Sequence, residues 1–171
     1  MAAMANFRLE MWDERGLLFD RRANTPEMQR HLGGVEQDEA IAARHRRVLD
    51  MIRDDAGEMF LIMIDGEADP VGSVGYWDKE WLGQTVYELG WKVLTGFQGR
   101  GLAVGATGET LRLAAARGRR RWAHAYPKAG NEASNAVCRK AGFELLGETD
   151  FEYPKGVPIR CSDWRFDLER I

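Results

Sequence analysis

The segment from Gly96 to Thr110, GFQGRGLAVGATGET, contains five glycines in fifteen residues. It follows TVYELGWKVL, a run of strand-forming residues, and it continues into LAVGATGETLRLAAAR, where small and apolar residues recur at helical intervals. A strand that passes through glycines into a helix turns several free backbone N–H groups toward one point, where the helix dipole also favours negative charge. The sequence therefore predicts an anion-binding site at the start of this helix, with phosphate as its usual ligand.

Two common phosphate-binding motifs fit this segment poorly. A P-loop requires Lys and then Ser or Thr directly after its last glycine, but Leu102 and Ala103 follow Gly101. A dinucleotide-binding motif that opened at Gly99 would need a glycine where Val104 stands, and no acid lies near residue 121 to bind a ribose. Hydrolysis of nucleoside triphosphates is therefore rejected, and dinucleotide binding is weakly supported.

A third family fits better. Residues 98–103, QGRGLA, resemble the Gln/Arg-x-x-Gly-x-Gly/Ala signature of the GNAT superfamily of acyl-CoA-dependent N-acetyltransferases. Further along, NEASNAVCRKAGFELLG is similar to a later segment of that family, in a spacing common in the branch that includes ribosomal-protein-alanine and aminoglycoside acetyltransferases. Upstream, ELGWKV resembles the family's central strand. The resemblance covers residues 71–143 well and the two ends only through the order of the elements.

The resemblance implies a coenzyme site with two parts. Backbone amides of the glycine loop and of the following helix would hold the pyrophosphate of coenzyme A, while Trp91 and Val93 would offer backbone groups to the pantetheine arm where their strand splays from its parallel neighbour. Asn131 and Ser134 would lie beside this arm. The candidate coenzyme-binding residues are Trp91, Val93, Gln98, Gly99, Arg100, Gly101, Leu102, Ala103, Asn131 and Ser134.

Several of these residues also have a purely structural interpretation. The side chains of Trp91 and Val93 could equally belong to the core. Arg100 could approach a phosphate or face solvent, and its backbone N–H is the better candidate ligand. Asn131 can cap the helix that starts at residue 132, and Ser134 can be an inert helical serine.

Glu88 is the candidate general base. Amide formation requires a neutral amine that loses a proton as it attacks the thioester, and α-amines and lysines have pKa values near 8 and near 10.4. Alternation puts Glu88 on the face opposite Tyr87 and Leu89, so it could instead be a solvent-facing or paired acid. Ser134 is the second catalytic candidate, as a group that assists the reaction at the sulfur of the thioester.

The sequence departs from the family at the group that protonates the leaving thiolate. Many relatives carry a tyrosine where this chain has Cys138, which we interpret as a buried structural cysteine. Releasing a thiol of pKa about 8.5 without protonation costs only about 2 kcal/mol at pH 7, so the loss is tolerable. Water, Ser134 or another tyrosine such as Tyr76 could supply the proton.

Periodicity and turn signals predict an α/β (α+β) chain that forms a single domain over residues 1–171. With the resemblance, we expect a GNAT fold with a mixed central sheet of six to seven strands flanked by about four helices. Strands are predicted at 7–12, 58–65, 70–78, 85–94, 120–127, 143–153 and 159–169, and helices at 24–34, 35–55, 102–117 and 132–141.

Charge is distributed unevenly along the chain. The net charge is −3, yet residues 96–140 hold nine Lys or Arg against two Glu. This split suggests an anionic ligand for one part of the chain and a cationic partner for the rest, or only a solvated surface. The basic run RGRRR at 117–121 sits at a helix end without any recognition module, so no nucleic-acid partner is predicted. In the family resemblance, this run would border the outer phosphate end of the coenzyme.

The sequence predicts neither a membrane partner nor a bound metal. The longest apolar run, residues 59–64, is too short to cross a bilayer, and the start MAAMANFRLEMW lacks a basic leader and an apolar signal core. The two cysteines and three scattered histidines show no metal-ligand spacing, so we expect no metal, no membrane partner and a cytoplasmic protein. A homodimer is left open.

The predicted function is transfer of an acetyl group from acetyl-CoA directly to an amine acceptor, such as a protein N-terminus, an aminoglycoside or a small amine. The alternative is an acyl-CoA-binding sensor domain of the same fold with little turnover.

Overall fold

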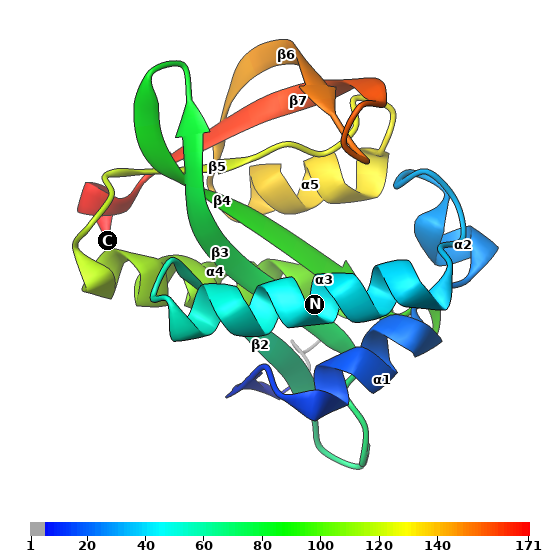
Figure 1. The fold of residues 1–171 in the computed structure, drawn as a ribbon. Coiled ribbons are helices and arrows are strands. Elements are labelled where there is room, and N and C mark those ends of the chain that lie inside the picture. The colour runs from blue at the N-terminus through cyan, green and yellow to red at the C-terminus, as the bar shows by residue number, and fades with distance from the viewer. Residues whose placement is uncertain (1–5) are drawn as a thin grey trace.

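The computed structural model describes residues 6–171, so the first five residues, on which the prediction of no signal peptide partly depends, lie outside the described part. Seven strands form one sheet in the order β1-β2-β3-β4-β5-β7-β6, as Figure 1 shows. The strands are β1 (Phe7–Met11), β2 (Gly57–Ile64), β3 (Gly72–Trp81), β4 (Gln84–Val93), β5 (Trp122–Ala125), β6 (Glu144–Glu152) and β7 (Pro158–Asp167). The helices are α1 (Glu14–Arg22), α2 (Pro26–Gln29), α3 (Asp38–Arg53), α4 (Leu102–Arg117) and α5 (Glu132–Lys140), with short 3-10 turns η1 (Thr95–Phe97) and η2 (Leu168–Arg170).

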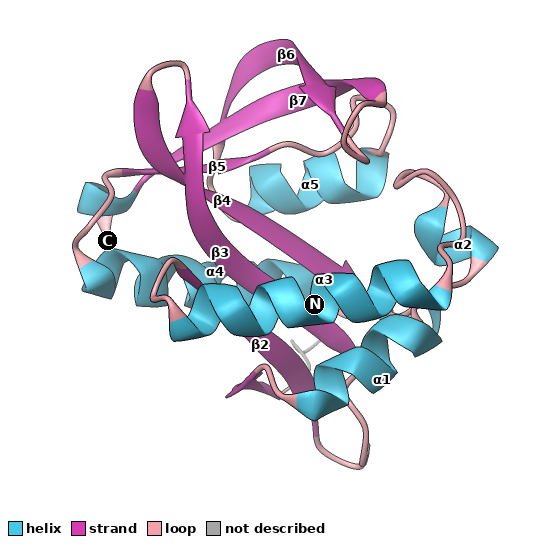
Figure 2. Ribbon diagram, viewed as in Figure 1, coloured by secondary structure: helices cyan, strands magenta, loops and turns pink. Residues whose placement is uncertain are grey.

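The sheet is antiparallel except at its centre. Strands β1 to β4 follow one another as an antiparallel meander, and β5, β7 and β6 form a second antiparallel group. The two groups meet where β4 pairs with β5 in parallel. This arrangement confirms the predicted mixed sheet and the antiparallel meander at its start (Figure 2).

Helices cover both faces of the sheet, and β2 shows why. Its residues Phe60, Ile62 and Ile64 belong to the larger core, which also contains residues of α4 and α5. The intervening Leu61 and Met63 belong to a smaller core with residues of α1 and α3. Because successive side chains of a strand point to opposite faces, α1 and α3 lie on one face and α4 on the other, as Figure 1 shows.

Helix α1 is an element that the sequence pattern does not predict. Asp13 caps it, since its carboxylate accepts a hydrogen bond from the N–H of Arg15 at 2.9 Å. Phe19 is buried in the smaller core, where α1 packs against α3. A Cβ added to Gly16 would lie 2.1 Å from the Trp12 ring, so glycine allows this close approach. The helix therefore depends on tertiary packing more than on helical periodicity.

The predicted cap of α5 is confirmed, and α2 has a side-chain cap of the same kind. Thr25 caps α2 by accepting from the N–H of Met28 at 3.2 Å. Asn131 caps α5 by accepting from the N–H of Ser134 at 3.2 Å. Asn24, next to Thr25, exchanges two hydrogen bonds with the backbone of Glu36, each 2.9 Å long.

The basic run at residues 117–121 lies at the C-terminal end of α4, opposite the glycine loop. A helix of sixteen residues is about 24 Å long, so the predicted place of this run beside the coenzyme was wrong. Four of its arginines donate to acids of other segments: Arg117 and Arg119 to Asp55, Arg120 to Asp78, and Arg121 to Asp167. These pairs account for part of the uneven charge, because acids from the rest of the chain neutralise the run.

No helix within residues 6–171 is both long and apolar enough to cross a membrane.

Candidate active site

The central feature of the site is a gap between β4 and β5. The two strands pair only at Tyr87 with Ala123 and at Glu88 with His124. On its other side, β4 remains paired with β3 as far as Val93, which lies opposite Gly72. Beyond Glu88, the β5-facing edge of β4 therefore has no strand partner within the described residues.

The backbone groups of Trp91 and Val93 face this gap. Leu94 donates its N–H to the carbonyl of Val71, on the β3 side, at 2.9 Å. Because backbone groups of a strand alternate in direction, those of Val93 and Trp91 turn to the opposite side. The Val93 carbonyl accepts a hydrogen bond from the side-chain Nε2 of Gln98 at 2.8 Å, which fastens the glycine loop to the strand.

The glycine loop leads into α4 through two residues in the left-handed region. Gly99 has φ of +75° and Gly101, the N-cap of α4, has φ of +77°, with no side-chain cap. The first N–H that bonds back along the helix is that of Gly105, to the carbonyl of Gly101 at 3.0 Å. Within residues 6–171, the N–H groups of residues 99–104 have no partner, so they are available to an anion where the helix dipole is also favourable.

Two residues of the loop have roles that differ from those expected. The N–H of Gln98 bonds the carbonyl of Thr95 at 3.3 Å, so this amide is not one of the free donors that the sequence predicts. The guanidinium of Arg100 donates to the carbonyl of Gly96 at 3.0 Å and lies over the Phe97 ring, 5.0 Å from its centre. The Arg100 side chain therefore folds back on the loop, while its backbone N–H has no partner within residues 6–171.

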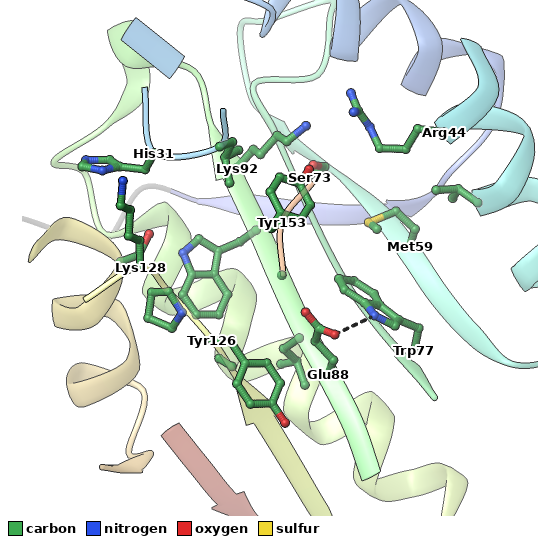
Figure 3. A pocket seen from close by; sticks show the side chains of 18 of the residues that line it. His31, Arg44, Met59, Ser73, Trp77, Glu88, Lys92, Tyr126, Lys128 and Tyr153 are labelled. Carbon is green, nitrogen blue, oxygen red and sulfur yellow. Dashed lines mark hydrogen bonds between the residues drawn. The ribbon is translucent and has the colours of Figure 1, made fainter. Parts of the chain in front are cut away.

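Two adjoining cavities meet at the gap. One, of about 490 Å³, is lined by the glycine loop and the first turn of α4, and we call it the loop cavity. The other, of about 500 Å³, is lined by Glu88 and by residues of α3, and we call it the Glu88 cavity (Figure 3). Both cavities are lined by His31, Leu32, Trp91, Lys92, Asn131 and Ser134. All the candidate coenzyme residues except Arg100 thus line one continuous site together with Glu88.

Glu88 is a largely buried carboxylate held by two donors. Its side chain is 19% exposed, and its Oε2 accepts from the Trp77 indole N–H at 3.2 Å and lies 3.6 Å from the Lys79 ammonium. Burial raises the pKa of Glu88, and the charge of Lys79 and the hydrogen bond from Trp77 oppose this increase only in part. Glu88 is therefore a paired acid inside the cavity, and its raised pKa moves it toward the range that suits a general base.

Lys79 and the aromatic residues around it were not predicted. The Lys79 ammonium lies 4.6 Å from the centre of the Phe151 ring and 5.6 Å from that of Tyr126. The alternation of Trp77 and Lys79 along β3 is visible in the sequence, but only the register of β3 against β4 brings them to Glu88. Phe151 comes from β6, at the far edge of the sheet, so no local signal could have found it.

The structure narrows the candidates for the proton donor. Tyr76 donates its hydroxyl to Glu58 at 2.5 Å and belongs to the larger core, so it does not reach either cavity and its suggested role was wrong. Cys138 is fully buried, and burial raises the pKa of its thiol to about 12, as the structural interpretation requires. Ser134 lines both cavities, so it remains a candidate together with water.

His45 and His124 contact different partners and not each other. His45 accepts from the Trp12 indole N–H at 3.0 Å, and the Nδ1 of His124 lies 2.6 Å from Asp163. Within residues 6–171, no group of three or more His, Cys, Asp or Glu is arranged to hold a metal ion.

Comparison with known proteins identifies the family. A family model described as an acetyltransferase (GNAT) domain matches residues 7–144. The chain belongs to the GNAT acetyltransferase family. A comparison of this GNAT protein with curated protein sequences finds no match.

Solved structures share the fold of this GNAT protein. RimL, a ribosomal L7/L12 alpha-N-protein acetyltransferase in complex with coenzyme A, has a TM-score of 0.79 and 18% identity, with 99% of each chain covered. A ribosomal-protein-S5-alanine acetyltransferase from Vibrio fischeri has a TM-score of 0.78 and 14% identity, covering 98% of this chain and 96% of its own. The aminoglycoside acetyltransferase AAC(6')-Ib with coenzyme A has a TM-score of 0.77 and 18% identity, covering 96% and 98%. The predicted family, GNAT fold and acetyltransferase class are confirmed.

Proposed function

We propose that this GNAT protein transfers an acetyl group from acetyl-CoA directly to an amine, with residues 1–171 acting as a single domain. The observation that carries the proposal is the open edge of β4, which lies between the free N–H groups of α4 and the buried carboxylate of Glu88. A thioester placed in this gap would have a phosphate site at one end and a proton acceptor at the other.

The coenzyme would bind along the loop cavity. Its diphosphate would accept hydrogen bonds from the N–H groups of residues 99–104, and its pantetheine arm would lie beside the backbone of Trp91 and Val93. Asn131 and Ser134 line the opposite wall at the start of α5. RimL and AAC(6')-Ib, which share the fold, were both solved with coenzyme A.

The reaction would proceed in one displacement. The amine nitrogen bonds to the thioester carbonyl carbon, Glu88 takes the proton that the nitrogen loses, directly or through a water molecule, and the carbon–sulfur bond breaks to release the thiolate. Ser134 or water then protonates the thiolate. Most of the rate would come from positioning and from backbone donors near the carbonyl oxygen, with the proton transfer as a smaller contribution.

Three further features of the protein are part of the proposal. A cytoplasmic location is supported by the two cysteines, which are buried and free. A homodimer would use the edge strand β6, where Leu145 and Leu146 are exposed. The acceptor is an amine, but the acidic part of the chain no longer indicates a cationic one, since several of its acids pair with the arginines at 117–121.

The proposal is tested with the variant Glu88→Gln. We expect this variant to bind coenzyme A as the wild type does, seen as an equal rise in melting temperature, and to lose most of its turnover at neutral pH. Glu80→Gln, an exposed acid of β3, serves as the matched control and should keep full activity. Unchanged turnover of Glu88→Gln would falsify its role as base. Stabilisation by coenzyme A without transfer to any amine would instead favour the acyl-CoA sensor.

A further inference from the structure

The Glu88 cavity, where the acceptor would bind, is lined by more basic than acidic side chains. Its basic lining residues are Arg44, Arg47, Lys92 and Lys128. Its acidic lining residues are Asp20 and Glu88. His31 also lines the cavity, and burial together with the nearby cations lowers its pKa, so it adds no positive charge at neutral pH.

Neither acid of the lining is free to hold a cationic acceptor. Asp20 is buried and lies 3.3 Å from the Nε of Arg44 and 3.1 Å from the Nζ of Lys92. Glu88 lies 3.6 Å from Lys79. A second positive charge on the acceptor would therefore meet carboxylates that are already neutralised.

The basic side chains, by contrast, keep unused donors. The Nε of Arg44 donates to Asp20, and its Nη1 donates to Glu36 at 2.6 Å. Its buried Nη2 has no hydrogen-bond partner within residues 6–171. None of the ion pairs formed within residues 6–171 involves Arg47 or Lys128. A buried guanidinium N–H without an acceptor is unfavourable, so an anion that reaches Arg44 would be stabilised.

Arg44 and Arg47 reach the cavity from one face of α3. They are three residues apart, the spacing at which helical side chains lie side by side, and Met51 continues the same face. Arg46 and Arg47 are both exposed, but only Arg47 lines the cavity. Figure 3 shows Arg44 and Lys92 at the same end of the cavity, together with Tyr153, and Glu88 at the other end.

The strand register gives the spacing between the two ends. Lys92 lies opposite Ser73, and Glu88 lies opposite Trp77, four residues along the same strands. Gly90 is halfway between them and borders the gap, so each end is about 7 Å from it along β4. An amine that reacts at the gap would then place a group about 7 Å away beside Lys92 and Arg44, which is the length of about two extended residues.

We propose that the acceptor of this GNAT protein carries a carboxylate within about two residues of its reactive amine, as in an acidic peptide N-terminus or an amino acid with a second carboxylate. This inference rests on the proposed acetyltransferase function. The amine lies at the β4–β5 gap near Gly90, and the carboxylate lies beside Lys92 and Arg44, with Arg47 next along the same face of α3.

The test compares amines that differ in charge. Three peptide amides, identical except for aspartate, asparagine or lysine at the second residue, are assayed for kcat/KM with acetyl-CoA, next to free glutamate, spermidine and an aminoglycoside. We expect the aspartate peptide to exceed the asparagine peptide by on the order of tenfold, with the lysine peptide lower still. The ratio of the aspartate peptide to free glutamate separates a peptide acceptor from a small one.

Variants of α3 supply the matched control. Arg47→Glu should invert the preference between the aspartate and lysine peptides, whereas Arg46→Glu, one residue away and outside the cavity, should leave it unchanged. Transfer to spermidine or the aminoglycoside in preference to every acidic amine overturns the inference while the acetyltransferase function stands. Equal effects of Arg47→Glu and Arg46→Glu on the preference between the aspartate and lysine peptides also overturn the inference. Transfer to none of the amines, with coenzyme A still bound, overturns both.

Discussion

Replacing Gly99 by alanine tests the phosphate-binding loop directly, because the chain contains a close control. Gly99 precedes α4 with φ of +75°, and Gly118 ends the same helix with φ of +64°. No atom lies within 4 Å of a Cβ built on either residue, so neither substitution causes a clash. The two variants differ in their position relative to the loop cavity, which Gly99 lines and Gly118 does not.

The expected magnitude follows from the backbone conformation. An L-residue in the left-handed region is disfavoured by about 1–2 kcal/mol relative to glycine. Gly118→Ala should therefore lose about 1–2 kcal/mol of unfolding free energy, which lowers the melting temperature of a domain of this size by about 2–8 °C. Gly99→Ala should lose at most the same amount, and less if its loop relaxes in the free protein, so the difference in stability between the two variants measures the cost left for binding.

Coenzyme binding should separate the two variants. In the free Gly99→Ala protein the loop can relax away from the left-handed conformation, and binding must restore that conformation before the N–H groups converge on the diphosphate. Restoring it weakens binding by up to the same 1–2 kcal/mol, or about 5- to 30-fold in Kd. Gly118→Ala should bind coenzyme A as the wild type does.

Calorimetry measures both quantities, with titration of coenzyme A for the Kd and a thermal scan for stability. A Kd for Gly99→Ala within twofold of the wild type, in a variant that loses clearly less stability than Gly118→Ala and so has a relaxed loop, would refute the loop as the diphosphate site. If Gly118→Ala weakened the binding of coenzyme A as much as Gly99→Ala does, the cause would be a general loss of structure instead.

Three further outcomes are expected. Lys79→Met removes a charge that lowers the pKa of Glu88, so the pKa should rise and the acidic limb of the kcat/KM profile, where activity is lost as the carboxylate becomes protonated, should move to higher pH. Asn131→Ala removes the cap of α5 and should lower the unfolding free energy by about 1 kcal/mol in a denaturant titration. Cys138 and Cys161 should resist alkylation in the folded protein at pH 8 and react after unfolding, as seen by mass spectrometry, because burial raises the pKa of their thiols to about 12 and about 11.

Much of the fold and the shape of the coenzyme loop could be predicted because they depend on local backbone requirements. Gly99 and Gly101 have positive φ where the sequence places them before a helix, and Asn131 caps α5 as its position indicates. The alternation in β4 correctly predicts that Glu88 lies on the face opposite Tyr87, which belongs to the larger core. Such features need only the residue and its near neighbours in sequence, so they can be recognised without the tertiary structure.

The environment of these residues could not be predicted in the same way. Glu88 becomes a buried base candidate only because strand register brings Trp77 and Lys79 to it, and the gap beside it exists only because β5 diverges after two pairs. Likewise, the guanidinium of Arg100 looks available in the sequence, yet it folds back on the loop.

The amino-acid pattern alone indicates where the helices after α1 lie and which segment offers free N–H groups to a phosphate. Which charges remain available depends on the folded chain: the arginines at 117–121 are neutralised by distant acids, while Arg44 and Arg47 on α3 line the acceptor cavity with donors unused. Backbone conformation is set by each residue and its neighbours in sequence, whereas the net charge and burial of a site are sums over residues that meet only when the sheet has formed.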